Sequence, residues 1–290
     1  MLLRTLALAA ASAVFVVLGV QNAVASQLID RNSTGVQLAA NSKGQALLIY
    51  RSHGVLHHVL ASGAIGAQPP NRATPQVHFV INYRGPSALP GAACGAYDGP
   101  QLAWLVKACK APDGSYWALQ SWQRLQPNYG GTKAPWELRL SHWVGDPAEM
   151  QIGLDWAYRR FDHLFGRLTY AGQPVYGFLA SRSGNPLDTY GRNVYLDTLD
   201  SSYGQGWHRE NSFLLQNPTG AFCYGFFAHG GKGTGKGMKY RATIIGPGVT
   251  PDVMWEGDAP GAFDHTRDLQ ATEEQKQLFA SSAAGGCTPK

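Results

Sequence analysis

Acidic and aromatic side chains are concentrated in one stretch of the chain, NPLDTYGRNVYLDTLDSSYGQGWHREN, from Asn185 to Asn211. Aromatic rings cover the apolar faces of pyranose sugars, and carboxylates accept hydrogen bonds from sugar hydroxyl groups. Two glycines flanking Gln205 allow a sharp loop that turns a large ring outward. The stretch therefore predicts a carbohydrate-binding surface. Its predicted ligand-binding residues are Asp188, Tyr190, Asp197, Asp200, Tyr203, Trp207 and Glu210.

The same residue types fit two other functions. Two carboxylates on opposite sides of a cleft hydrolyse glycosidic bonds, so a secreted glycan hydrolase is one alternative. Asp and Asn beside Gly also make turns, and Tyr and Trp pack across strands. A cell-envelope interaction module without a small-molecule site is therefore the other alternative. The sequence leaves open whether the protein is an enzyme, and it identifies no catalytic residue.

A second stretch, HGGKGTGKGMKY from His229 to Tyr240, comes close to a nucleotide-binding loop. Such a loop opens a helix, and it ends in a Ser or Thr that holds magnesium. Here Gly237 stands in that last position, and the next residues, KYRATIIG, have the pattern of a β-strand. The stretch is predicted to be a glycine-rich hairpin loop between two strands, with Lys236 in solvent and no bound nucleotide.

Metals, cofactors and nucleic acids are not predicted partners. The chain contains no Cys-x-x-Cys spacing for zinc, no Gly-x-Ser-x-Gly motif, and histidines that are scattered along the sequence. The formal net charge is +5, of which Arg4 contributes one, and the basic residues form no long run. That charge is too small to indicate nucleic-acid binding. The predicted partner is an extracellular glycan or a cell-envelope polymer.

The first residues have the pattern of a secretory signal. Arg4 precedes a short apolar run that ends in Ala23-Val24-Ala25, which predicts cleavage after residue 25. The run is short for a membrane span, and no later segment has about 18 consecutive apolar residues, so no transmembrane anchor is predicted. The protein is expected to be secreted, to the extracellular space or to the periplasm and cell envelope.

All four cysteines lie after the predicted signal, and export favours their oxidation. Four cysteines allow three pairings. The expected pairs are Cys94–Cys109, on either side of a predicted helix, and Cys223–Cys287, which would tie the C-terminus to a strand.

The remaining chain, residues 26–290, is expected to form a single β-rich domain. Short aromatic or β-branched runs alternate with turn residues, as at His53-Gly54 and Ala171-Gly172. In SYWALQSWQ, from Ser115 to Gln123, this alternation predicts one buried and one exposed face. The predicted fold is an all-β sandwich, or a jelly-roll-like relative, stapled by disulfides. Two short helices are expected, one at about 100–110 and one at about 273–280, the latter started by Thr272 with Gln275.

Overall fold

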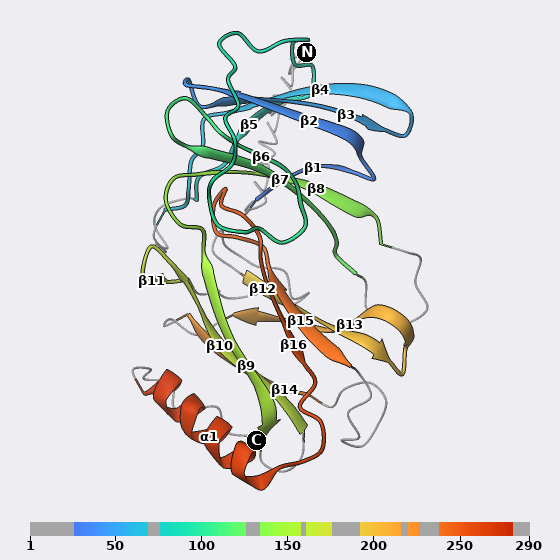
Figure 1. Cartoon of the computed structure of the whole chain (residues 1–290), viewed down its shortest axis with the longest axis vertical. Helices are drawn as coiled ribbons and strands as arrows, with labels where there is room; N and C mark the ends of the chain where they lie inside the picture. Colours follow the sequence, from blue (N-terminus) through green and yellow to red (C-terminus); the bar gives the residue numbers. More distant parts are fainter. Residues whose placement is uncertain are drawn as a thin grey trace, which may run out of the picture.

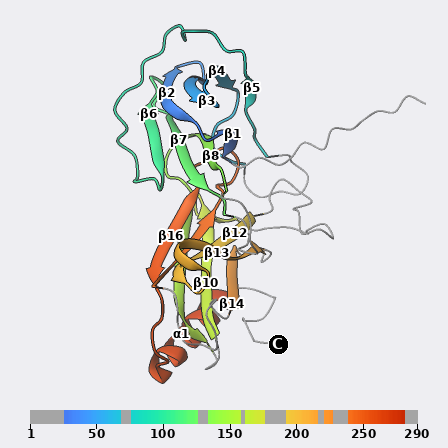
Figure 2. The same ribbon diagram turned by 90° about the vertical axis from the view of Figure 1, so that its right-hand side faces the viewer.

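The computed structural model describes residues 26–68, 76–125, 134–157, 161–175, 192–215, 220–226 and 238–280. These residues form four antiparallel sheets and one helix. The molecule is elongated: β1–β8 lie in one half, and β9–β16 with the helix α1 lie in the other (Figures 1 and 2). The prediction of a mostly β fold is confirmed.

The first half contains two sheets whose buried side chains meet in one core. Leu48 and Tyr50 of one sheet and Trp117, Leu119 and Leu138 of the other belong to this core. The first sheet has the order β1-β8-β7-β6, and the second has the order β2-β3-β4-β5. The strands are β1 (Gln27–Arg31), β2 (Thr34–Asn41), β3 (Gln45–Ser52), β4 (Val55–Ser62), β5 (Val80–Asn82), β6 (Leu105–Lys110), β7 (Tyr116–Gln123) and β8 (Trp136–Trp143).

The second half repeats this arrangement with its own core. Leu164 and Phe222 from one sheet pack with Leu196, Tyr240 and Ile244 from the other. In the first of these sheets β10 pairs with β9, β11 and β14, and the second has the order β13-β12-β15-β16. The strands are β9 (Glu149–Ala157), β10 (Phe161–Tyr170), β11 (Gln173–Pro174), β12 (Arg192–Ser201), β13 (Gly204–Leu215), β14 (Ala221–Phe226), β15 (Lys239–Ile244) and β16 (Val253–Asp258).

The connection between β15 and β16 leaves its own half and inserts into the first (Figure 1). Val249 joins the core of the first half, and its carbonyl accepts a 2.8 Å hydrogen bond from the backbone of His142. At the end of the connection, Asp252 is buried and accepts hydrogen bonds from Ser26 and from Trp122 Nε1, the latter at 2.7 Å. Arg139 Nε lies 3.3 Å from the same carboxylate. A polar clamp therefore joins the two halves.

The clamp also explains why the alternating strand β7 is buried on both faces. Trp117 and Leu119 pack into the core of the first half, as one predicted face should. Gln120 and Trp122 on the other face bond to Asp252 and are buried as well. The prediction of one exposed face is wrong, because a segment distant in sequence covers it.

The two predicted hairpin turns are confirmed. His53 and Gly54 connect β3 to β4 with φ values of 50° and 80°, and Ala171 and Gly172 connect β10 to β11 with φ values of 49° and 71°. Positive φ at both central residues is what a two-residue hairpin turn of type I′ requires.

The predicted helix at 100–110 is wrong. Residues 105–110 form the strand β6, which pairs with β7 from Leu105 opposite Gln120 to Lys110 opposite Tyr116. The apolar spacing fitted a helix, but pairing with a central strand outweighs a local preference of this size. Trp104 comes directly before β6 with a φ of 50°, a left-handed backbone conformation.

The one helix of the described residues, α1 (His265–Phe279), includes the predicted segment but starts earlier. Its N-cap is Asp264, whose carboxylate accepts hydrogen bonds from the backbone of Thr266 and Arg267. Thr272, the expected cap, lies inside the helix, and its hydroxyl donates to the carbonyl of Asp268 at 2.7 Å. In the described part of the chain, no helix has the length and apolar character needed to cross a membrane.

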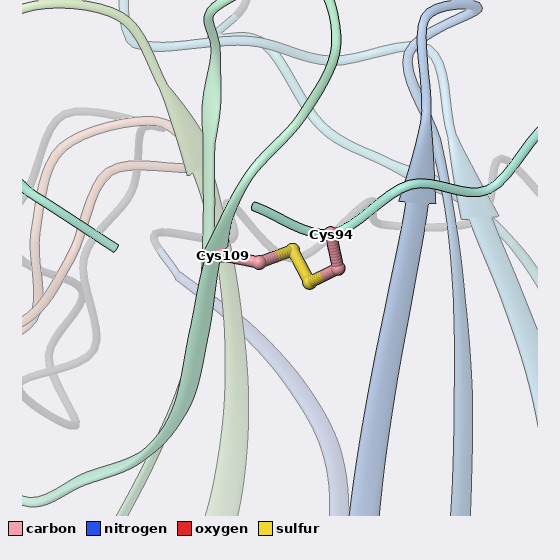
Figure 3. The surroundings of a disulfide bond; sticks show 2 residues. All are labelled: Cys94 and Cys109. Atoms are coloured by element: carbon pink, nitrogen blue, oxygen red, sulfur yellow. A yellow bond between two sulfur atoms is a disulfide. The ribbon is translucent and has the colours of Figure 1, made fainter. Parts of the chain in front are cut away.

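The disulfide between Cys94 and Cys109 is confirmed (Figure 3). It ties the segment before β6 to that strand, with a sequence separation of 15 residues. Cys223 on β14 is also disulfide-bonded, while its predicted partner Cys287 lies outside the described residues.

Two further predictions fall on residues outside the described ranges, namely the signal segment 1–25 and the glycine-rich loop up to residue 237, which includes Lys236. The element after the loop is β15, a strand as predicted and not a helix. The loop does not close a hairpin, however. β14 pairs with β10, while β15 pairs with β12 and β16, so the flanking strands belong to different sheets.

Candidate functional site

Asp197 lies at the centre of a group of charged and aromatic side chains on the outer face of the β13-β12-β15-β16 sheet. Its cross-strand neighbours are Arg209 on β13 and Arg241 on β15. Arg209 Nε donates to Oδ1 at 2.5 Å, and Arg241 Nε donates to Oδ2 at 2.9 Å. One carboxylate therefore holds two arginines, and both Asp197 and Arg209 are almost fully buried.

Aromatic rings lie against both guanidinium groups. The Cζ atom of Arg209 lies 4.7 Å from the ring centre of Tyr195, and that of Arg241 lies 4.4 Å from Trp207. Contacts of this kind contribute about 0.5 to 2 kcal/mol each, more when water is excluded. We call the group Tyr195, Asp197, Trp207, Arg209 and Arg241, together with Trp104 and Trp122 of the first half, the arginine–aromatic cluster.

The two tryptophans of the first half complete this cluster across the junction. Trp104 and Trp122 stack with ring centres 5.4 Å apart, and Trp122 lies 6.0 Å from Tyr195. Trp104 also lies 5.9 Å from the guanidinium of Arg241. Its left-handed backbone costs roughly 1 to 2 kcal/mol for a residue with a bulky side chain. The fold therefore places this ring beside Arg241 in spite of local strain.

The predicted binding residues are divided between two faces of the sheet. Asp197 and Trp207 belong to the arginine–aromatic cluster. Glu210 points to the other face, where it accepts a 3.1 Å hydrogen bond from Thr198 Oγ1. A bulge in β13 next to Glu210 produces this division, because it brings Arg209 opposite Asp197.

The other predicted residues lie near the turn between β12 and β13 or outside the residues that the structure describes. Asp200 lies at an irregular point near the end of β12 with a φ of 51°, and its carboxylate accepts the backbone N–H of Gly206 at 2.7 Å. The ring of Tyr203 lies 6.1 Å from that of His208. Asp188 and Tyr190 lie outside the described residues.

Sequence reasoning missed the arginines and the distant tryptophans. Tyr195, Asp197, Trp207 and Arg209 alternate along two paired strands, so the period-two pattern was a usable signal for one shared face. Arg241 and the rings of Trp104 and Trp122 come from distant segments. No local pattern marks them.

A cavity of about 420 Å³ is lined in part by residues 100–103, directly before Trp104. Leu102 and Ala103 form one wall, and Met254 at the start of β16 forms another. Asp146 in the connection between β8 and β9 and Glu149 at the start of β9, both exposed, line it as well. Asp252 lines the cavity too, so the cavity combines apolar walls with acidic residues at the junction of the two halves.

Asp162 on β10 has an altered acidity but no access to solvent. Burial raises the pKa of its carboxyl to about 6, the nearby charge of Glu210 adds to this, and a hydrogen bond from Tyr240 opposes it. The Tyr240 hydroxyl donates to Oδ2 at 2.6 Å. Asp162 is 3% exposed, so we assign it to the core and not to a site.

Ser115 and His142 have the geometry of a nucleophile and its base but lie in the core as well. His142 Nε2 is 2.9 Å from Ser115 Oγ, and His142 Nδ1 donates to the carbonyl of Ala64 at 2.5 Å. The carboxylate of Asp113 bonds the serine and not the histidine, at 2.6 Å. Both Ser115 and His142 are at most 3% exposed, and the imidazole stacks on Trp117 at 3.7 Å. We therefore assign the group to packing.

Among the described residues, no group of three or more His, Cys, Asp or Glu side chains is arranged to hold a metal ion. Comparison of the chain with protein-family models, with curated proteins and with solved structures found no match.

Proposed function

We propose that the protein is an exported β-sandwich protein that binds a carbohydrate of the cell surface or cell envelope at the arginine–aromatic cluster. The observation that carries the proposal is the half-buried ring of Trp207, which lies beside Arg241 at the rim of the cluster. An indole ring covers the apolar face of a sugar, while guanidinium N–H groups donate to its oxygens.

The strain at Trp104 supports this proposal. A large ring held next to Arg241 by a left-handed backbone is the kind of local cost that functional sites carry. The disulfide Cys94–Cys109 supports the part of the proposal that concerns export, because such bonds persist in oxidising compartments.

A glycan array with three proteins tests the proposal. Wild type is expected to bind at least one glycan, and Trp207→Ala is expected to lose at least tenfold in affinity. The matched control is Trp136→Ala, since Trp136 is 48% exposed on β8 and belongs to no part of the cluster. This control should bind like wild type.

Thermal melts of the same three proteins separate binding from packing. A half-buried ring at a binding site is expected to change the melting temperature only slightly when it is truncated. A core Trp→Ala change costs about 3 to 5 kcal/mol. Absence of glycan binding by wild type, or unfolding of Trp207→Ala, contradicts the proposed site.

Hydrolysis of glycans is a second candidate, favoured by one observation. Asp146 and Glu149 line the same cavity, and paired carboxylates facing one space are what glycosidases use. Release of reducing ends from a bound glycan, abolished by Asp146→Asn or Glu149→Gln, would support this activity. Glycan binding without release of reducing ends supports a binding protein. If the protein neither binds nor cleaves glycans, the remaining candidate is an interaction module of the cell envelope.

A further inference from the structure

We propose that the ligand is an acidic glycan, whose sugar carboxylate binds Arg241 at the rim of the arginine–aromatic cluster. This inference rests on the proposed function and names the chemical class of the ligand.

The first step concerns the donors that Asp197 leaves unused. Arg209 and Arg241 each reach its carboxylate through Nε, one at each oxygen. Asp197 thus fixes both side chains while it leaves the Nη end of Arg241, whose side chain is 13% exposed, for another acceptor. The Nη end of Arg209 is buried. In the part of the chain that the structure describes, Arg241 forms no other hydrogen bond or ion pair.

The second step is an unsatisfied donor. Nη2 of Arg209 is buried and has no hydrogen-bond partner in the described structure, although the residue is only 3% exposed. A buried donor on a charged group is unfavourable when it has no acceptor. The cluster therefore favours the arrival of negative charge.

The third step is the balance of charge. Two guanidinium groups face one carboxylate, which leaves one positive charge in the cluster. Among the neighbouring charges, Lys239 lies 3.2 Å from Glu256, and Arg124 shares the carboxylate of Glu137 with Arg31 and Arg139. These neighbours therefore bring no unpaired negative charge to the cluster. A neutral sugar leaves the excess positive charge in place, whereas a single carboxylate balances it.

The fourth step fixes the kind of anion. A planar guanidinium pairs with a planar carboxylate through two parallel hydrogen bonds. Trp207 has Arg241 on one side of its ring, so the exposed remainder of the ring is where a pyranose can pack. A uronic-acid unit offers both parts, because it carries a carboxylate on a pyranose ring.

The experiment compares oligosaccharides that differ in the carboxylate alone. The probes are oligomers of galacturonate, glucuronate and mannuronate, each with its carboxyl-reduced neutral counterpart, and calorimetry gives the dissociation constants. Wild type should bind at least one uronide tenfold or more tightly than its neutral form, a difference of about 1.4 kcal/mol. Arg241→Gln should reduce this preference to less than twofold.

Controls keep the result specific to Arg241. Lys276→Gln removes the same charge from α1, where Lys276 is exposed and pairs with Glu273, and it should keep the full preference. Arg241→Lys retains the charge without the planar fork, so it should keep part of the preference even if Arg241→Gln does not fold.

The outcomes separate the inference from the proposed function. Equal binding of charged and neutral forms by wild type overturns the acidic-glycan inference and leaves carbohydrate binding intact. Equal loss in Lys276→Gln and Arg241→Gln also overturns it, since net charge alone would then explain the preference. Failure of every probe and of the glycan array overturns both proposals.

Discussion

Asp162 and its neighbour His163 respond to pH in opposite directions. Burial raises the pKa of Asp162 to about 6 from an ordinary value of 3.8, so between these values the folded protein holds a proton that the unfolded chain releases. The unfolding free energy contributed by this group therefore falls as the pH rises through that range. Burial lowers the pKa of His163 to about 4, which makes its contribution rise with pH.

Asp162→Asn should therefore make the protein's stability rise more steeply with pH between about 4 and 6 than it does in wild type. The substitution removes the contribution of Asp162 to the pH dependence of the unfolding free energy, while the contribution of His163 remains. Over this pH range, the change in unfolding free energy should differ between variant and wild type by on the order of 3 kcal/mol. Urea titrations at a series of pH values measure it. Glu274→Gln on the exposed side of α1 is the control and should leave the slope unchanged. Parallel pH profiles for wild type and Asp162→Asn would refute this account.

At the scale of single elements, the disulfide is expected to stabilise the β6 edge of the first half. A loop closed by cysteines 15 residues apart is worth about 3 kcal/mol in the chain-entropy description. The double variant Cys94→Ser/Cys109→Ser should lose about this much unfolding free energy in urea. Reduction is the weaker test, because it also breaks the disulfide at Cys223. A loss of unfolding free energy below about 1 kcal/mol would show that the segment before β6 stays ordered without the disulfide.

Elements that depend on their own residues were predictable from the sequence, and elements that depend on distant partners were not. The hairpin turn at His53 and Gly54 follows from local conformational preferences alone. The apolar spacing of β6 predicts a helix, and pairing with β7 overrides that spacing. The site divides in the same way. Asp197 and Trp207 follow from alternation along the paired strands β12 and β13, whereas Arg241 comes from a strand that only the fold brings near.

At the scale of the whole molecule, Asp252 holds the two halves together, and we propose that residues 26–290 act as one domain. Its carboxylate lies within bonding distance of Trp122 and Arg139, and it is fully buried. Asp252→Ala should cost about 3 to 5 kcal/mol, because Arg139 is left as a buried charge with one partner fewer. Calorimetry should show one transition for wild type and two separated transitions for the variant.

The control for this prediction is Asp258, at the far end of the strand that follows Asp252. Asp258→Ala removes an exposed carboxylate from β16 and should change stability by less than about 0.5 kcal/mol. Two transitions already present in wild type would mean that the halves are independent domains. Unchanged stability in Asp252→Ala would mean that the clamp does not hold them together.

The inserted connection also sets an order of events during synthesis. Val249 occupies the core of the first half, and its N–H and carbonyl bond to Gly66 and His142, each at 2.8 Å. The chain leaves the ribosome, or a translocation channel, with its N-terminus in front. The strands β1–β8 therefore emerge long before residue 249 does. Contacts between residues so far apart in sequence form slowly. The first half must therefore wait, incomplete and open to chaperones and proteases, until nearly the whole chain has been delivered.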